Sequence, residues 1–281
     1  MINSLPKVTI GMPVYNGEKY LKKSLDALIS QSFRDFELII SDNASSDGTY
    51  DICTEYSMND ERIKYVRQSE NIGAWENFKY VLNKAQGEFF MWSAADDIRS
   101  IDFVELNYNF LSSNQDYVAS TCPNRFEENI SGTSFSLDEN DNHKRYVKFF
   151  DYCWFSHGIF YSLIRLEQLK KCPLLKESVV FFAADWAIDI FIASKGKINL
   201  TDEGFTLFNA EGESKKSDHL KRSRIKHIEY YVPFYGLSIF VFRLIKQLTL
   251  LNRLSIVMIL IRLNIKINLD RFKSNIKTII D

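Results

Sequence analysis

Two adjacent carboxylates follow closely behind an apolar run in the first third of the chain. The run 89–93 has the composition of a buried strand, and Asp96 and Asp97 come soon after it. In an open α/β sheet, ligands bind beyond the carboxyl ends of the strands, and carboxylate oxygens suit Mg²⁺ or Mn²⁺. Both residues are therefore candidate ligands of a divalent cation. The structural alternative is that one of them caps the next helix, which is a common role of Asp.

A third Asp stands at the end of another apolar run. Asp42 ends the stretch that begins at Phe36, and small polar residues follow it as far as Thr49. A carboxylate beside such a loop suits a nucleotide, although the same composition also fits an ordinary turn. Neither G-x-G-x-x-G nor the phosphate loop G-x-x-x-x-G-K-[ST] is present. A bound diphosphate would therefore depend on a cation at Asp96 or Asp97.

The elements that must position these residues follow an alternating pattern. Over residues 7–97, short apolar runs alternate with amphipathic stretches, as expected of βαβ units that build a parallel sheet. Strands are predicted at 8–12, 36–40, 63–66 and 89–93, the first ended by Pro13, with helices between them. Farther on, 124–143 is polar and predicts a surface excursion, whereas 154–169 and 181–194 have helical spacing. The predicted fold is α/β, with a mixed, mostly parallel sheet flanked by helices.

Charge separates the end of the chain from the rest. Residues 221–281 hold twelve Lys or Arg against three acids, although the whole chain has a net charge of −1. The tail also carries an apolar stripe at helical spacing, formed by Leu237, Phe240, Val241, Leu244, Ile245 and Leu248. We therefore predict a domain over 1–214 and a basic amphipathic helical tail over 215–281. The uncharged stretch 230–242 is too short to span a bilayer, so the tail is expected to bind an anionic membrane surface. The alternative is a helical hairpin packed on the domain or on a second subunit.

The cellular compartment is predicted from the amino terminus and the cysteines. The chain begins without a basic segment followed by a long apolar stretch, so no secretory signal is expected. The four cysteines form no C-x-x-C pair and no zinc spacing. They are predicted to be buried, reduced thiols. The expected location is the cytoplasm, at the inner face of the cell membrane.

Five short motifs occur in one order and spacing along residues 6–210. They are Pro13-Val14-Tyr15-Asn16-Gly17, the block from Asp42 to Thr49, Asn71-Ile72-Gly73, Ala85-Gln86-Gly87-Glu88 and Ala95-Asp96-Asp97. In this order the chain resembles family 2 glycosyltransferases with the GT-A fold, of the kind that build bacterial surface polysaccharides. One departure is that the family often has Asp where this chain has Ala94.

The resemblance assigns roles on the donor side. It implies that Pro13 and Tyr15 flank the base of a nucleotide sugar and that Asp42 hydrogen-bonds it. Asn16 and Asn71 belong to motifs on the same side. Asp97 would ligate Mn²⁺ or Mg²⁺, and Asp96 would face the ribose or the metal.

The resemblance also implies transfer of the sugar to an acceptor hydroxyl with inversion at the anomeric carbon, which needs a general base. The family places a Glu-Asp pair before a helix, and here Ala184 replaces the Glu, leaving Asp185 as the candidate base; the alternative is a helix cap. Trp154, His157 and Trp186 are candidate acceptor-side residues, with core packing as the alternative. His219 is a candidate contact in a closed state, with a solvated tail residue as the alternative.

The expected function is thus an inverting, metal-dependent glycosyltransferase. UDP is the nucleotide that the resemblance favours, with dTDP and GDP open, and the acceptor is expected to be a lipid-linked or growing saccharide. A metal-dependent nucleotidyltransferase is the first alternative, but it should carry a glycine-rich, basic loop after the first strand. A nucleic-acid-binding protein is the second, and the apolar residues interleaved in the tail argue against it. The expected partners include a second copy of the chain but no nucleic acid.

Overall fold

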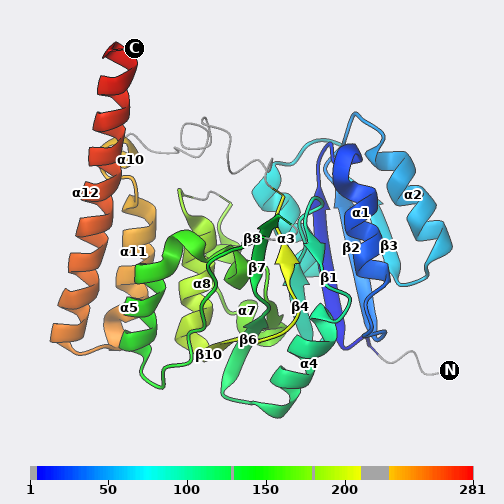
Figure 1. The fold of residues 1–281 in the computed structure, drawn as a ribbon, viewed down its shortest axis with the longest axis horizontal. Helices are drawn as coiled ribbons and strands as arrows, with labels where there is room; N and C mark the ends of the chain where they lie inside the picture. Colours follow the sequence, from blue (N-terminus) through cyan, green and yellow to red (C-terminus); the bar gives the residue numbers. More distant parts are fainter. Residues whose placement is uncertain (1–4, 128–129, 179–180, 210–227, 281) are drawn as a thin grey trace.

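A seven-stranded sheet forms the centre of the molecule (Figure 1). The computed structural model describes residues 5–127, 130–178, 181–209 and 228–280. The strand order is β10-β6-β9-β4-β1-β2-β3. The strands are β1 (Val8–Val14), β2 (Phe36–Asp42), β3 (Ile63–Arg67), β4 (Phe89–Trp92), β6 (Tyr117–Thr121), β9 (Leu163–Arg165) and β10 (Lys197–Leu200). Only β9 runs antiparallel to its neighbours. The predicted mixed, mostly parallel sheet is confirmed.

Two hydrophobic clusters cover the faces of the sheet. Along β4, Phe89 and Met91 belong to one cluster, and Phe90 and Trp92 belong to the other. This alternation follows from the two-residue period of a strand, and it shows why a parallel strand buried on both faces is apolar throughout. One cluster contains residues of helices α1 (Glu18–Ile29), α2 (Thr49–Asn59) and α4 (Phe103–Ser113). The other contains residues of α3 (Ala74–Lys84), α5 (Asn142–Tyr152) and α8 (Ala184–Lys195).

The first strand extends past the residue predicted to end it. Pro13 lies within β1, where it pairs with Ser41 of β2. The pairing of β1 with β4 ends at Gly11 and Trp92. Pro13 therefore stands where one side of β1 has no strand partner, a position that tolerates a residue without a backbone N–H.

A second, four-stranded sheet occupies part of the polar region. It has the order β5-β11-β7-β8, with β5 (Ile98–Arg99), β7 (Asn124–Glu127), β8 (Ile130–Ser131) and β11 (Thr206–Leu207). The prediction of a surface excursion is thus wrong for 124–127 and 130–131, because β7 pairs with β11 and β8 pairs with β7. The prediction of helical structure over 154–169 is also partly wrong. The short helices η1 (Cys153–Phe155), α6 (His157–Phe160) and α7 (Leu166–Leu169) flank strand β9, and η2 (Pro173–Lys176) follows.

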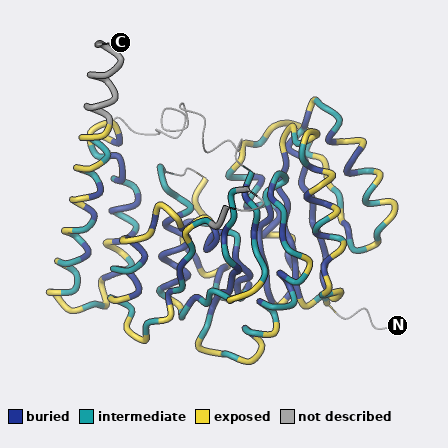
Figure 2. The backbone as a smooth tube through the Cα atoms, in the orientation of Figure 1, coloured by how far each residue is buried: buried dark blue, intermediate teal, exposed yellow. Residues whose placement is uncertain are grey.

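The tail forms helices that pack on the domain (Figures 1 and 2). Helices α10 (Ile228–Tyr231) and α11 (Tyr235–Leu244) are followed by the 3₁₀ turn η4 (Ile245–Gln247) and by α12 (Leu250–Ile280). Helix α11 contacts α8, and α12 contacts α5. The members Leu237, Val241 and Ile245 of the predicted stripe are buried in the core. Of the helices in the described ranges, none is both long and apolar enough to cross a bilayer. All four cysteines are buried and unpaired.

Candidate active site

The donor-side residues gather at one edge of the sheet because neighbouring parallel strands end there. Val14 pairs with Asp42 at the ends of β1 and β2, and the backbone N–H of Ser93, just after β4, bonds to the carbonyl of Gly11. The segment that leads to Asp96 and Asp97 therefore starts beside the strand that leads to Tyr15. This is the crevice in which ligands of open α/β sheets bind.

Asp42 is completely buried and already holds protein partners. One carboxylate oxygen accepts a hydrogen bond from the backbone N–H of Ser45 at 2.8 Å, and the other accepts one from the Tyr65 hydroxyl at 3.0 Å. Arg67 Nε lies 3.9 Å from the second oxygen. Burial and the hydrogen bond to Asp42 raise the pKa of the Tyr65 hydroxyl, so this residue stays a hydrogen-bond donor. Asp42 therefore organises the end of β3 in addition to any contact with a nucleotide.

The two loops at this edge are bonded to each other. The backbone N–H of Asn16 donates to Ser45 Oγ at 2.9 Å, and Asn16 Oδ1 accepts from the backbone N–H of Ser46 at 2.9 Å. Asn16 has a φ of 51°, a left-handed conformation that Asn tolerates better than most residues. These bonds leave the ring of Tyr15, which is 53% exposed, free to contact a ligand.

Asn71 belongs to the same network through Asn43. Asn43 Nδ2 donates to Asn71 Oδ1 at 2.9 Å, and Asn43 Oδ1 accepts from the backbone N–H of Ile72 at 2.8 Å. Asn71 Oδ1 also accepts from the N–H of Gly73, whose φ of 84° suits glycine. Asn71 thus fixes the loop that leads into α3, and its side-chain oxygen already has two protein donors.

Asp97 is a buried carboxylate with weak compensation. It is 5% exposed, and it accepts a long hydrogen bond of 3.4 Å from the backbone N–H of Asn209. Burial raises the pKa of Asp97 to about 7; Arg99 opposes this rise, and the charge of Asp96 adds to it. Two adjacent carboxylates fit a divalent cation whose remaining ligands are phosphates and water. Within the described ranges, no group of three or more acidic, His or Cys side chains forms a fuller metal site.

Arg99 connects residues 94–97, here called the candidate donor tip, to residues 154–161, here called the candidate acceptor segment. It is 3% exposed and donates to Ser93 Oγ at 2.8 Å, to the carbonyl of Trp92 at 3.0 Å and to the carbonyl of Tyr161 at 3.4 Å. A buried guanidinium keeps its charge because its pKa is so high. Arg99 therefore supplies the positive charge that limits the rise in the pKa of Asp97.

Tyr161 lies near the candidate metal ligands Asp96 and Asp97 and also near the candidate base Asp185. Burial raises the pKa of its hydroxyl, and the charges of Asp97, Asp96 and Asp185 raise it further. All three carboxylates therefore lie close enough to Tyr161 for their charges to raise the pKa of its hydroxyl, whereas Arg99 opposes this rise. Tyr161, Tyr65, Arg67 and Asn43 were not among the predicted site residues.

Asp185 is the second residue of α8, and a buried acid stands one turn after it. Asp189 is fully buried, and among the described residues neither of its carboxyl oxygens has a partner with hydrogen-bond geometry, although Ser156 lies nearby. Burial, and then the charge of Asp185, hold the pKa of Asp189 well above its usual range. Asp189 therefore holds its proton more strongly than an ordinary Asp does. Asp185 is partly exposed, so of the two acids it is the one that a ligand can reach.

The candidate acceptor-side residues divide into two groups. His157 is exposed at the start of α6, and its ring lies 6.0 Å from that of Phe208, next to the Asn209 that bonds to Asp97. Trp154 is 38% exposed and meets the buried Trp186 edge to face at 4.9 Å. His157 thus lies toward the donor tip, whereas the two tryptophans face the tail. His219 lies outside the described residues.

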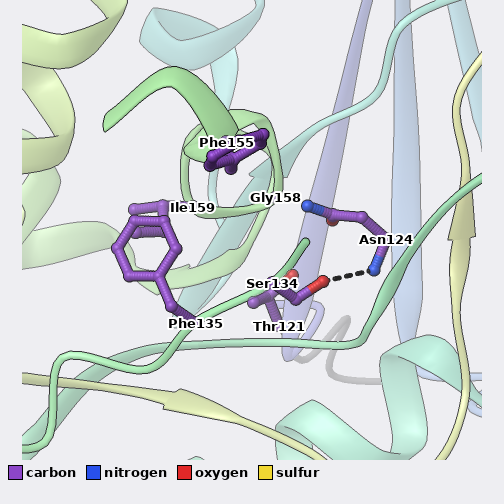
Figure 3. A pocket seen from close by; sticks show the side chains of 7 residues that line it. All are labelled: Thr121, Asn124, Ser134, Phe135, Phe155, Gly158 and Ile159. Atoms are coloured by element: carbon purple, nitrogen blue, oxygen red, sulfur yellow. Dashed lines mark hydrogen bonds between the residues drawn. The ribbon is translucent and has the colours of Figure 1, made fainter. Parts of the chain in front are cut away.

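A small cavity separates the acceptor segment from β6 and β7 (Figure 3). It is lined by Thr121, Asn124, Ser134, Phe135, Phe155, Gly158 and Ile159. Its volume of about 10 Å³ leaves room for a water molecule at most. A Cβ on Gly158 would come within 2.5 Å of Asn124 Oδ1. The cavity is therefore part of the support beneath α6 and not a sugar site.

Similarity to known proteins agrees with the fold and the motifs. The family model described as glycosyl transferase family 2 matches residues 9–168, and the chain belongs to this family. Glycosyltransferase GlyA of Streptococcus pneumoniae is 28% identical over 173 residues, which are 60% of this chain and 23% of GlyA. The putative teichuronic acid biosynthesis glycosyltransferase TuaG of Bacillus subtilis is 35% identical over 111 residues, 40% of this chain and 44% of TuaG. The chain spans less than half the length of these curated relatives.

Solved structures support the GT-A fold. S. aureus TarS 1–349 in complex with UDP-GlcNAc has a TM-score of 0.67 at 18% identity, covering 89% of this chain and 70% of that one. The mannosyltransferase PcManGT from Pyrobaculum calidifontis, in complex with GDP-Man and Mn²⁺, has a TM-score of 0.57 at 16% identity, covering 90% and 74%. This chain is therefore a family 2 glycosyltransferase with a GT-A fold, and the alternatives of nucleotidyl transfer and nucleic-acid binding are not supported.

Proposed function

We propose that this enzyme transfers a sugar from a nucleoside-diphosphate donor to an acceptor hydroxyl with inversion of configuration. The observation that carries the proposal is that Asp96, Asp97 and Asp185 all lie close enough to Tyr161 for their charges to raise the pKa of its hydroxyl. A donor sugar placed there would have the carboxylates of the candidate metal site on its diphosphate side and a candidate base near its acceptor. UDP is the favoured nucleotide, because TarS, a neighbour in fold, binds UDP-GlcNAc.

The residues would share the reaction as follows. Asp185 accepts the proton of the acceptor hydroxyl as the hydroxyl oxygen attacks the anomeric carbon. The new C–O bond forms on the face opposite the diphosphate while the bond to the departing phosphate oxygen breaks, which inverts the configuration. Asp96 and Asp97 would hold Mn²⁺ or Mg²⁺, which when bound supplies positive charge next to the leaving diphosphate.

The role of Asp185 can be tested by replacing it with Asn. Asp185→Asn keeps the size of the side chain but removes its basicity, so turnover should collapse while donor affinity stays nearly intact. Asp151→Asn, at an exposed acid on α5, is the matched control and should retain full activity. Substantial transfer by Asp185→Asn would place the base elsewhere.

The donor can be identified by thermal shift. Panels of UDP-, dTDP- and GDP-sugars, each with and without Mn²⁺, should give a cation-dependent stabilisation for one nucleotide, because ligands that bind the native state raise its melting temperature. A stabilisation that is the same with and without Mn²⁺ would argue against the metal-dependent part of the proposal.

We place the acceptor, a lipid-linked or growing saccharide, at the inner face of the cell membrane. Support comes from the outward side of α12, where Leu254, Met258, Ile261, Ile265 and Leu269 are each between 46% and 54% exposed and recur at helical spacing. An apolar groove of about 370 Å³ between α11 and α12 adjoins this stripe. The exposed Arg243, Lys246, Arg262 and Lys266 accompany it, with Asp270 as an exposed acid. Two copies facing each other here would bring mainly like charges together, whereas anionic lipid would neutralise them.

Membrane binding is tested with point variants, because Phe234, Leu237 and Val241 are buried and removing the tail would open the core. The double variant Ile261→Ser with Ile265→Ser should lose binding to vesicles that contain phosphatidylglycerol, relative to phosphatidylcholine alone. Met58→Ser, at an 80% exposed residue on α2, is the control. Unchanged vesicle binding, or a concentration-dependent dimer that the double variant dissolves, would overturn this part of the proposal.

A further inference from the structure

The turn that leads into α8 has an unusual backbone. Ala183, two residues before Asp185, has a φ of 62° and a ψ of 41°. This left-handed region is sparsely populated by residues other than glycine. Such conformations persist when the surrounding structure fixes them. The residues packed against this turn therefore influence the position and orientation of Asp185.

The start of α11 presses directly on this turn. Gly236 lies so close to Phe181 that a Cβ on the glycine would stand 2.3 Å from both Cβ and Cγ of the phenylalanine. A real Cβ does not approach another carbon so closely, so a side chain at position 236 would displace Phe181 or α11. Glycine at this position allows the tail helix to reach the turn.

Phe234 holds the other side of the turn and the first residues of α8. Its ring is fully buried, 5.2 Å from the ring of Phe182 and 5.3 Å from that of Trp186, on which it stacks at 19°. The backbone N–H of Phe234 donates to Asn264 Oδ1 of α12 at 2.9 Å. Phe182 and Trp186 bracket Asp185 in the chain, so contacts from the tail meet both sides of the candidate base.

We infer that Phe234 and Gly236 of the tail are positioning residues that hold Asp185 in its catalytic orientation. The inference rests on the proposed role of Asp185, and it gives the tail a function in catalysis that is separate from membrane binding. The GT-A sheet brings the carboxylates to one edge. The tail then fixes the aromatic residues on either side of the base.

The test measures kcat, the KM for the donor and the pH profile of kcat/KM for Phe234→Leu and Gly236→Ala in the full chain. A small displacement of a reacting group costs up to roughly 100-fold in rate, so we expect kcat to fall by about 10- to 100-fold while the KM for the donor stays the same. The acidic limb of the kcat/KM profile reports the base, and it should shift in both variants. If Phe234→Leu does not fold, Phe234→Met, which nearly conserves the volume, takes its place.

Two matched controls separate positioning from general loss of packing. Phe149→Leu removes an equally buried ring from the same core, where Phe149 packs against Phe150 of α5. Phe242→Leu changes a 40% exposed ring on α11. Both should keep kcat and the pH profile. Equal kcat in all four variants, or a loss in the Phe149 variant as large as that in the Phe234 variant, would overturn the inference. Failure of the proposed function would instead appear as turnover retained by Asp185→Asn.

Discussion

Replacing Asp189 with Asn should flatten the dependence of folding stability on pH. Asp189 is completely buried, its carboxyl oxygens have no partner with hydrogen-bond geometry in the described part of the chain, and Asp185 is a negative neighbour, so burial first and then this charge hold the pKa of Asp189 well above the usual range in the folded protein. The folded chain then holds a proton that the unfolded chain releases above pH of about 3.9. The contribution of Asp189 to the free energy of unfolding is fully present below that pH, and it is lost as the pH rises toward the pKa of Asp189 in the folded state. The slope is about 1.4 kcal/mol per pH unit for one proton.

Urea unfolding between pH 4 and 8 provides the measurement, with the stability of Asp189→Asn subtracted from that of the natural chain at each pH. The amide keeps the shape of the acid but does not titrate, so the natural chain should lose stability relative to the variant as the pH rises. A difference that stays constant with pH would mean that Asp189 ionises as readily in the folded as in the unfolded chain. A difference that changes with pH in the opposite direction would mean that the folded chain lowers the pKa of Asp189, as a bound cation would.

Three further changes test the donor tip, the end of β3 and the support of the acceptor segment. Asp97→Asn should abolish donor binding that depends on Mn²⁺, and unchanged binding by calorimetry would remove Asp97 from the cation site. Tyr65→Phe deprives a buried carboxylate of a hydrogen bond and should cost about 1–3 kcal/mol in urea unfolding, whereas Tyr50→Phe, at a 45% exposed ring, should cost little. Gly158→Ala places a Cβ within 2.5 Å of a buried amide oxygen, so the KM for the acceptor should rise while the KM for the donor stays constant.

The grouping of the candidate donor-side residues at one edge was largely predictable from the sequence because it follows from strand direction. Parallel neighbours end at the same edge, so the residues after β1, β2 and β4 had to meet once these strands were recognised. The same rule could have found Tyr65 and Arg67, since β3 lies next to β2 in the sheet. They were missed because strand order is not visible in a pattern of apolar residues.

The structure around β9 and the tail was less predictable, because it depends on contacts between segments that lie far apart in the sequence. Strand β9 has three residues within an aromatic segment of helical spacing, and its pairing with β4 and β6 identifies it as a strand. The periodicity of the tail predicted an apolar face but did not say what that face covers. In the structure, Leu237 and Val241 cover α8, whereas the exposed stripe belongs to α12.

The position of Arg99 has a thermodynamic consequence for the order of substrate binding. The Arg99 guanidinium donates to the carbonyl of Trp92 and to Ser93 Oγ, which come just before the candidate donor tip. It also donates to the carbonyl of Tyr161, which directly follows α6. A donor that orders the tip should therefore also order the acceptor segment. We expect nucleoside diphosphate to lower the Kd of the acceptor, and linkage requires the acceptor to lower the Kd of the nucleotide by the same factor. Calorimetric titrations in both orders would measure this coupling, and Arg99→Met should reduce it; a coupling that survives the substitution would assign it to another path.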